Sequence, residues 1–224
     1  MCSERDWLAQ AASPQGDGRP MLASRNEAYD LLTKLSASDR LLTHLELVGE
    51  AADELVRVYQ QLGVPIDVTL VELGVAVHDA GKIIHRNELD GPGSLHENTG
   101  REMLLELGVQ PEVAECCVSH GAWQGPRVSL EGRSVALADN LWKGKRVAEL
   151  ELAVIDGVAA RLGLTGGISS PASTRHSRKS QPPHRVGWNV AENSALPRDT
   201  AYGWCSFIPR VVSSLVQTAS SLSP

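Results

Sequence analysis

The feature that most constrains this chain is a histidine–aspartate pair at the end of a mainly apolar run. Residues 70–77 are followed directly by His78 and Asp79, and Gly81 and Lys82 come within the next turn. A carboxylate carried into a protein interior is costly unless it is paired or bound to a metal. Taken alone, the pair fits either a helix cap beside a structural core histidine or a ligand-binding site, because short motifs often match by chance.

Other residues of the same chemical types recur along the chain at long intervals. The order is histidine, histidine–aspartate, histidine, histidine and aspartate, with steps of 34, 17, 24 and 19 residues. These intervals are too long for one local loop, but they suit ligands that separate helices donate to a centre inside a bundle. The candidate metal ligands are His44, His78, Asp79, His96, His120 and Asp139.

Apolar residues at helical spacing predict an all-α fold. We expect Ser38 to cap the longest helix, which ends at Gly63, and Asp67 to cap a helix that is apolar almost all round and therefore buried. Pro111 suits the first turn of a later helix. The helices are expected over residues 25–35, 39–62, 67–80, 96–107, 111–120, 134–142 and 147–162, with loops over 86–95 and 121–131.

Composition divides the 224 residues into unequal parts. The composition of residues 1–24 predicts a flexible N-terminal lead, and that of residues 25–165 predicts a single domain. Residues 166–224 hold 12 Ser and 6 Pro and predict a disordered tail, so its His176 and His184 are left out of the site. Residues 1–165 carry 15 basic and 25 acidic side chains (net −10), whereas residues 166–224 carry 6 and 2 (net +4). An acidic body disfavours nucleic acid as a partner.

The remaining composition indicates a cytoplasmic protein without a membrane partner. No run of 18 apolar residues exists, and the N-terminus lacks the apolar core of a signal peptide. The four cysteines are too few and too scattered for a disulfide framework, which fits a reducing compartment. The sequence leaves the oligomeric state open.

Together these motifs resemble the HD-domain superfamily of metal-dependent phosphohydrolases. The resemblance covers about residues 25–163 and depends on the segments 40–44, 76–82 and 138–139 with His96 and His120. The His-Asp-x-Gly-Lys form and the two intervening histidines look most like the two-metal subgroup that includes the HD-GYP phosphodiesterases. No Gly-Tyr-Pro follows His120, however, because the residues there are Gly-Ala-Trp-Gln-Gly-Pro.

The resemblance implies a helical bundle with a metal site in its centre. It assigns His44, His78, Asp79 and Asp139 to a first divalent ion and His96 and His120 to a second ion, which Asp79 bridges to the first. Imidazole and carboxylate ligands favour Fe or Mn, with Zn, Co, Ni or Mg also open. The implied reaction is cleavage of a small phosphoester, of nucleotide or cyclic nucleotide type, by a metal-activated water.

Basic residues near the motifs are candidates for substrate binding. Lys82 lies three residues after Asp79, and helical geometry would place both on one face, so we assign Asp79 and Lys82 to catalysis and Lys82 to a substrate phosphate. Arg40, Lys143 and Arg146 are secondary candidates, for which a solvated basic surface is the simpler interpretation.

Two other functions fit the same residues. Some HD-fold proteins are di-iron oxygenases that act on a polyol or an organophosphonate with a similar ligand set. A non-catalytic regulatory module would keep the fold without turnover, although every ligand position is filled here. Oxygen consumption would identify the oxygenase, and absence of metal and turnover would identify the regulatory module.

Overall fold

The computed structural model describes residues 22–164, and every regular element in that range is a helix, as expected for an all-α fold. The predicted tail and residues 1–21 of the predicted lead lie outside the described residues. Leu22 is buried, and its backbone exchanges two hydrogen bonds with the side chain of Gln110. The elements are α2 (Arg25–Lys34), α3 (Asp39–Leu62), α4 (Val68–Val77), η1 (Ala80–Ile83), η2 (Arg86–Leu89), α5 (Leu95–Glu106), α6 (Pro111–Ala114), α7 (Cys116–Ser119), α8 (Leu130–Trp142) and α9 (Ala148–Arg161).

Short-range chemistry fixes most helix ends where the sequence predicts them. The Ser38 side chain accepts a hydrogen bond from the Leu41 amide at 3.3 Å, and Asp67 caps α4 in the same way. Gly63 ends α3 in the left-handed region, at φ 68°, where a side chain would be strained. Pro111 occupies the first turn of α6. These caps confirm four of the predicted boundaries.

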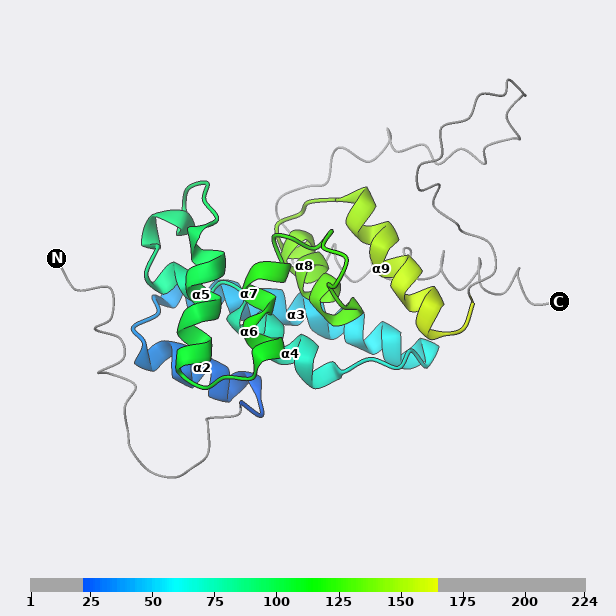
Figure 1. The fold of residues 1–224 in the computed structure, drawn as a ribbon, viewed down its shortest axis with the longest axis horizontal. Coiled ribbons are helices and arrows are strands. Elements are labelled where there is room, and N and C mark those ends of the chain that lie inside the picture. The colour runs from blue at the N-terminus through cyan, green and yellow to red at the C-terminus, as the bar shows by residue number, and fades with distance from the viewer. Residues whose placement is uncertain (1–21, 165–224) are drawn as a thin grey trace, which may run out of the picture.

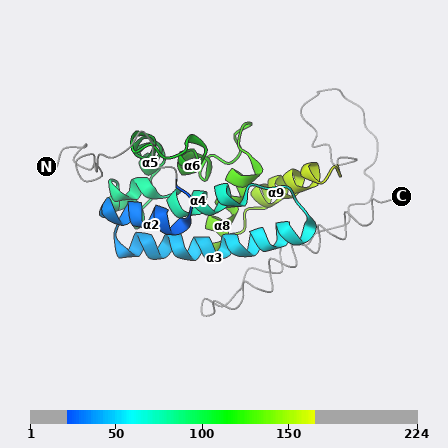
Figure 2. The same cartoon turned by 90° about the horizontal axis from the view of Figure 1, so that it is seen from below.

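Helix α4 is buried between neighbours on opposite sides. Figure 2 shows α3 along one side of α4 and α6 on the other. Val71 and Val75 of α4 belong to one apolar cluster, whereas Leu73 and Val77 belong to a second. Because both faces are covered, the almost uniformly apolar sequence of α4 is explained, and the residues that follow it enter the interior of the domain.

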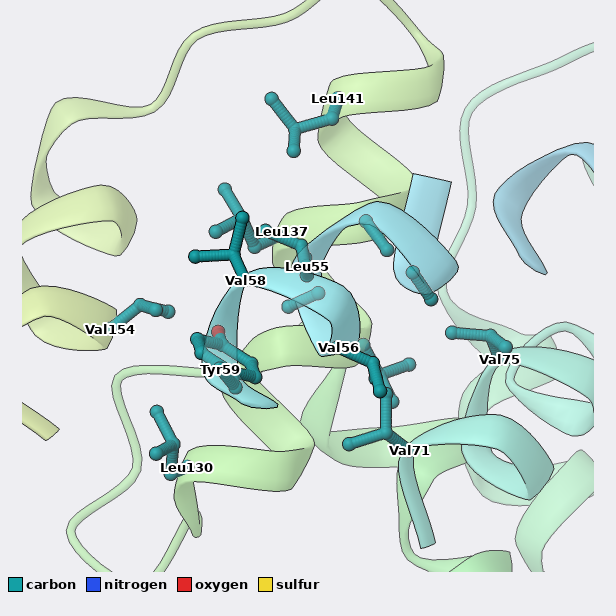
Figure 3. Close-up of a cluster of buried hydrophobic side chains, with 14 of the residues drawn as sticks. Leu55, Val56, Val58, Tyr59, Val71, Val75, Leu130, Leu137, Leu141 and Val154 are labelled. Carbon is teal, nitrogen blue, oxygen red and sulfur yellow. The ribbon is translucent and has the colours of Figure 1, made fainter. Parts of the chain in front are cut away.

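The two clusters divide the domain along its length. Figure 3 shows the first, in which Tyr59 and its neighbours on α3 meet side chains of α4, α8 and α9. The second joins α2, the start of α3, η1, α5 and α6. In Figure 1, α9 lies beside α8 at the end of the bundle away from α2 and α5.

The predicted helix over residues 67–80 ends early. Helix α4 stops at Val77, and Asp79 has φ −105° and ψ 15° before η1 begins. The tighter turn brings Gly81 against the start of α5, where a Cβ on Gly81 would lie 2.0 Å from the His96 carbonyl oxygen and 2.7 Å from the Gly100 amide nitrogen. Two backbones can approach this closely only because both Gly81 and Gly100 lack a side chain.

Two other predicted elements also differ. The expected helix over residues 111–120 is two short helices, α6 and α7, with Glu115 between them. Val113 of α6 packs in the second cluster and Cys116 of α7 in the first, so this segment serves both cores. Helix α8 begins at Leu130, inside the expected loop, because the Ser129 side chain caps the Gly132 amide at 3.2 Å.

We expect Gly81→Ala to lower the free energy of unfolding by about 3 kcal/mol, because the atoms that a Cβ would meet are backbone and cannot rotate away. For a domain of this size, that cost lowers the thermal midpoint by about 10 °C, which circular dichroism can follow. Gly91→Ala is the control, since Gly91 is exposed and its Cβ would meet a single atom, at 3.1 Å. Equal midpoints for the two variants would contradict this account of the η1–α5 contact.

Candidate metal centre

The fold brings six ligand-type side chains from different elements into one buried region. His44 comes from α3, His96 from α5 and Asp139 from α8, whereas His78, Asp79 and His120 directly follow helices. His78 and Asp79 are 0% and 1% exposed. All six candidate ligands of the sequence analysis therefore meet, although up to 34 residues separate neighbours along the chain.

The six side chains form two groups of three. In each group one nitrogen or oxygen atom per residue lies within 4.8 Å of the others. The first group is His44, His78 and Asp139, and the second is Asp79, His96 and His120. Each group offers two imidazoles and one carboxylate, a donor set that suits transition metals.

Asp79 faces both groups through different oxygen atoms. Its Oδ2 lies 3.1 Å from His44 Nε2 and 3.6 Å from His78 Nε2 in the first group. Its Oδ1 lies 3.2 Å from His96 Nε2 and 3.6 Å from His120 Nε2 in the second. One carboxylate thus connects the two groups.

Several of the atoms that face the centre have no hydrogen-bond partner within the part of the chain that the structure describes. Five of them are buried and lack a hydrogen-bond partner there. Buried polar atoms are nearly always paired, so a cluster of unpaired donors and acceptors needs an explanation such as a bound ion. The five are His44 Nε2, His78 Nε2, Asp79 Oδ1, His96 Nε2 and Asp139 Oδ1, and this set fits divalent cations.

The outward nitrogens of three histidines are held by acceptors. His78 Nδ1 donates to the Val75 carbonyl at 2.9 Å, and His120 Nδ1 donates to the Cys116 carbonyl at 3.2 Å. His96 Nδ1 lies 2.6 Å from a carboxylate oxygen of Glu88. A proton on Nδ1 leaves the Nε2 lone pair directed at the centre, which is the form that binds a metal.

His44 differs from the other three. Trp142 Nε1, which can only donate, lies 2.7 Å from His44 Nδ1. Neutral His44 in this arrangement carries its proton on Nε2, toward Asp79 and Asp139. Trp142 is not among the predicted site residues, because its pairing with His44 spans 98 residues and leaves no local signal in the sequence.

Glu88 is a buried acid of the site region that the sequence analysis missed. The predicted surface loop over residues 86–95 instead contains η2, and Glu88 is 6% exposed. Burial favours the neutral acid, but hydrogen bonds from the His96 side chain, the His96 amide and the Leu95 amide lower the pKa of Glu88. The only hint in the sequence is an acidic residue eight positions before a histidine, which is too common to be a signal.

The predicted basic residues divide into two kinds. Lys82 Nζ lies 2.7 Å from Asp79 Oδ2, and Lys143 Nζ lies 2.6 Å from Asp139 Oδ2, so both lysines contact the cluster. Arg40 and Arg146 pair with acids outside it: Arg40 pairs with Asp90, and Arg146 pairs with Glu151 at 2.5 Å. Of the four candidates, two therefore lie at the centre.

Electrostatics favours ionised acids and at least one neutral imidazole. Burial opposes ionisation of Asp79, but the neighbouring His78 and other imidazoles outweigh it and lower its pKa. Burial likewise opposes ionisation of Asp139, and His78 and Lys143 overcome it and lower its pKa. Burial and the nearby His78 lower the pKa of His120 to about 4. Ionised carboxylates and neutral imidazoles are the protonation states that metal coordination requires.

None of the helices within residues 22–164 combines the length and apolar composition needed to cross a membrane. Cys116 and Cys117 are buried, and neither forms a disulfide within those residues.

Comparisons with known proteins agree with this geometry. The family model of the HD domain matches residues 41–142, a range that includes all six clustered side chains. An uncharacterized protein of Methanocaldococcus jannaschii is 32% identical over 152 residues, which are 61% of this chain and 85% of that protein. No solved structure gives a significant match. The order, the burial and the convergence of the histidines and aspartates, together with these matches, show that the chain belongs to the HD domain family.

Proposed function

We propose that this protein is a metal-dependent phosphohydrolase that uses two divalent ions. The observation that carries the proposal is the Asp79 carboxylate, whose two oxygens face separate groups of histidines. Membership of the HD domain family supports the reaction type, since many of its members are metal-dependent hydrolases. The HD-x-G-K form and the complete second group support two ions rather than one.

The first ion would be held by His44, His78 and Asp139 with Asp79 Oδ2, and the second by His96 and His120 with Asp79 Oδ1. When bound, divalent ions supply Lewis acidity, which activates water as a nucleophile and neutralises charge on a phosphoryl group. Imidazole and carboxylate donors suit Fe, Mn, Zn or Co. We propose Fe or Mn first, with Zn, Co, Ni or Mg as further candidates.

The chain contributes fixed charge and a dry setting. Because His78 and Asp79 are almost fully buried, their side chains are shielded from bulk solvent. Lys82 and Lys143 place ammonium groups at the two aspartates and can bind phosphate oxygens as point charges. Within the described residues, Arg40 pairs with Asp90 and Arg146 pairs with Glu151, both outside the cluster.

The proposed substrate class is compatible with this charge. A small phosphoester, of nucleotide or cyclic nucleotide type, carries the negative charge that the lysines and the ions recognise. Attack of water on phosphorus forms one P–O bond and breaks another. A phosphomonoester then gives an alcohol or nucleoside and inorganic phosphate, whereas a cyclic nucleotide opens to a nucleoside monophosphate.

The function is tested on the full chain after anaerobic purification, by elemental analysis and a panel of phosphoesters. We expect close to two transition-metal ions per chain and product release without oxygen. Oxygen consumption with reduced iron, and no phosphoester cleavage, would support the HD-fold oxygenase that acts on a polyol or organophosphonate. Absence of both metal and turnover would support a non-catalytic regulatory module.

We expect Asp79→Ala to lose both ions, because its carboxylate serves both groups. Turnover should fall by more than about 100-fold, the upper end of what the loss of an outer hydrogen-bond partner costs. Elemental analysis and initial rates measure the two effects. Asp90→Ala is the control, since Asp90 is exposed and pairs with Arg40. Full metal content in Asp79→Ala would show that the ligand assignment is wrong.

We expect Lys82→Met to retain its metal and to raise KM by about 10-fold or more. A hydrogen bond to a charged group contributes about 1.5–3 kcal/mol, and about 1.4 kcal/mol corresponds to tenfold in binding. Steady-state kinetics with parallel elemental analysis measures both quantities. Lys34→Met, an exposed lysine in the last turn of α2, is the control. An unchanged KM would remove Lys82 from substrate binding.

A further inference from the structure

Glu88 is a buried carboxylate outside the six clustered side chains. Its Oε2 accepts hydrogen bonds from His96 Nδ1 at 2.6 Å and from the His96 amide at 3.1 Å. Its Oε1 accepts from the Leu95 amide at 3.2 Å. Each contact leads to His96 or to the residue before it, so Glu88 fixes both the ring and the backbone of this one histidine.

The loop before α5 packs closely against this carboxylate. A Cβ on Gly93 would lie 2.3 Å from Glu88 Cδ and Oε1, so a larger residue there would have to displace the Glu88 carboxylate. Ser94, at the cap position of α5, makes no side-chain capping bond, and Glu88 satisfies the first free amides of α5 in its place. Glu88 is therefore part of the frame that carries His96.

An ionised carboxylate can only accept, so the His96 ring donates from Nδ1 and directs the lone pair of Nε2 inward. Such a carboxylate also raises the basicity of the imidazole, which strengthens a metal bond at the other nitrogen. Nε2 of His96 lies 3.2 Å from Asp79 Oδ1 and is one of the buried atoms that lack a partner among the described residues. His120, the other histidine of the second group, donates from Nδ1 to a carbonyl and has the same orientation.

The first group is less prepared for a cation. Trp142 donates to His44 Nδ1, an arrangement that puts the proton of neutral His44 on Nε2, where an ion would bind. The two lysines of the cluster also bond the acids on this side: Lys82 bonds Asp79 Oδ2, and Lys143 bonds Asp139. The second group gains the negative charge of Glu88, whereas Lys143 bonds Asp139 of the first group and Lys82 bonds the Asp79 oxygen that faces the first group.

From this asymmetry we infer that Glu88 is a positioning residue that makes the Asp79–His96–His120 group the tighter of the two ion sites. The inference rests on the proposed two-ion function. It adds which ion is held more strongly and which residue outside the ligand set is responsible.

The test is a titration of the metal-free full chain with Mn²⁺. Calorimetry measures the heat of binding, and the electron paramagnetic resonance signal of free Mn²⁺ measures how much remains unbound. We expect two dissociation constants for the natural sequence. Glu88→Gln should weaken the tighter one by about 10-fold or more, within the range typical of losing an outer carboxylate, and leave the weaker one unchanged. Asp90→Asn is the matched control, because it makes the same acid-to-amide change two residues away on the exposed surface.

A double-mutant cycle separates this role from a general effect on stability. Glu88→Gln should have no effect on Mn²⁺ affinity once His96→Ala has removed its partner, and its full effect should persist with His44→Ala. Thermal unfolding of the metal-free variants reports any loss from the α5 cap separately from ion affinity.

The outcomes distinguish the two levels of the proposal. Uptake of two ions with Glu88→Gln unchanged, or an equal weakening of both ions, overturns the role of Glu88 alone. An effect of Glu88→Gln that survives His96→Ala also overturns it. A natural chain that takes up no Mn²⁺ overturns both the proposed function and this inference.

Discussion

The structure depends on one carboxylate that is shared by two sets of imidazoles. Asp79 sits between the histidines of the first and second groups, with 3.1 Å to His44 on one side and 3.2 Å to His96 on the other. A buried, ionised acid is stable only when charge or hydrogen bonds compensate it. The helices α3, α5, α7 and α8 each bring or precede one of the side chains that meet around this acid.

The apolar helix α4 is the means by which this acid becomes buried. Its two faces pack into the two clusters, so its end is fixed from both sides. The chain then leaves α4 in a tight turn and passes against α5 at Gly81 and Gly100. This contact puts the segment with Asp79 beside the start of α5, which carries His96, and so links the core to the site.

The surroundings of the six side chains are less symmetrical than the side chains themselves. Two imidazoles per group suggest equal sites, but Glu88 supports His96 while Trp142 donates to His44. Lys82 bonds the Asp79 oxygen that faces the first group, and Lys143 bonds Asp139 of that group. Outer contacts of this kind tune the basicity and orientation of a ligand, so identical ligand sets can differ in affinity.

The sequence by itself determined the all-α class, the buried state of α4, and the caps at Ser38 and Asp67, because each depends on residues within a few positions of one another. It also identified the six side chains that converge, since their order matches a known family. Their roles as metal ligands stay a prediction, as do the tail over residues 166–224 and the compartment.

Only the tertiary structure decided how those side chains divide into groups and what supports them. Glu88 was assigned to a surface loop, because nothing local shows that η2 folds back onto α5. The turn after α4 places Gly81 against the backbone of Gly100, and the partner of His44 lies 98 residues away. Helical periodicity reports which face of a segment is apolar, whereas these contacts depend on which segments meet, and that is fixed only when the whole chain packs.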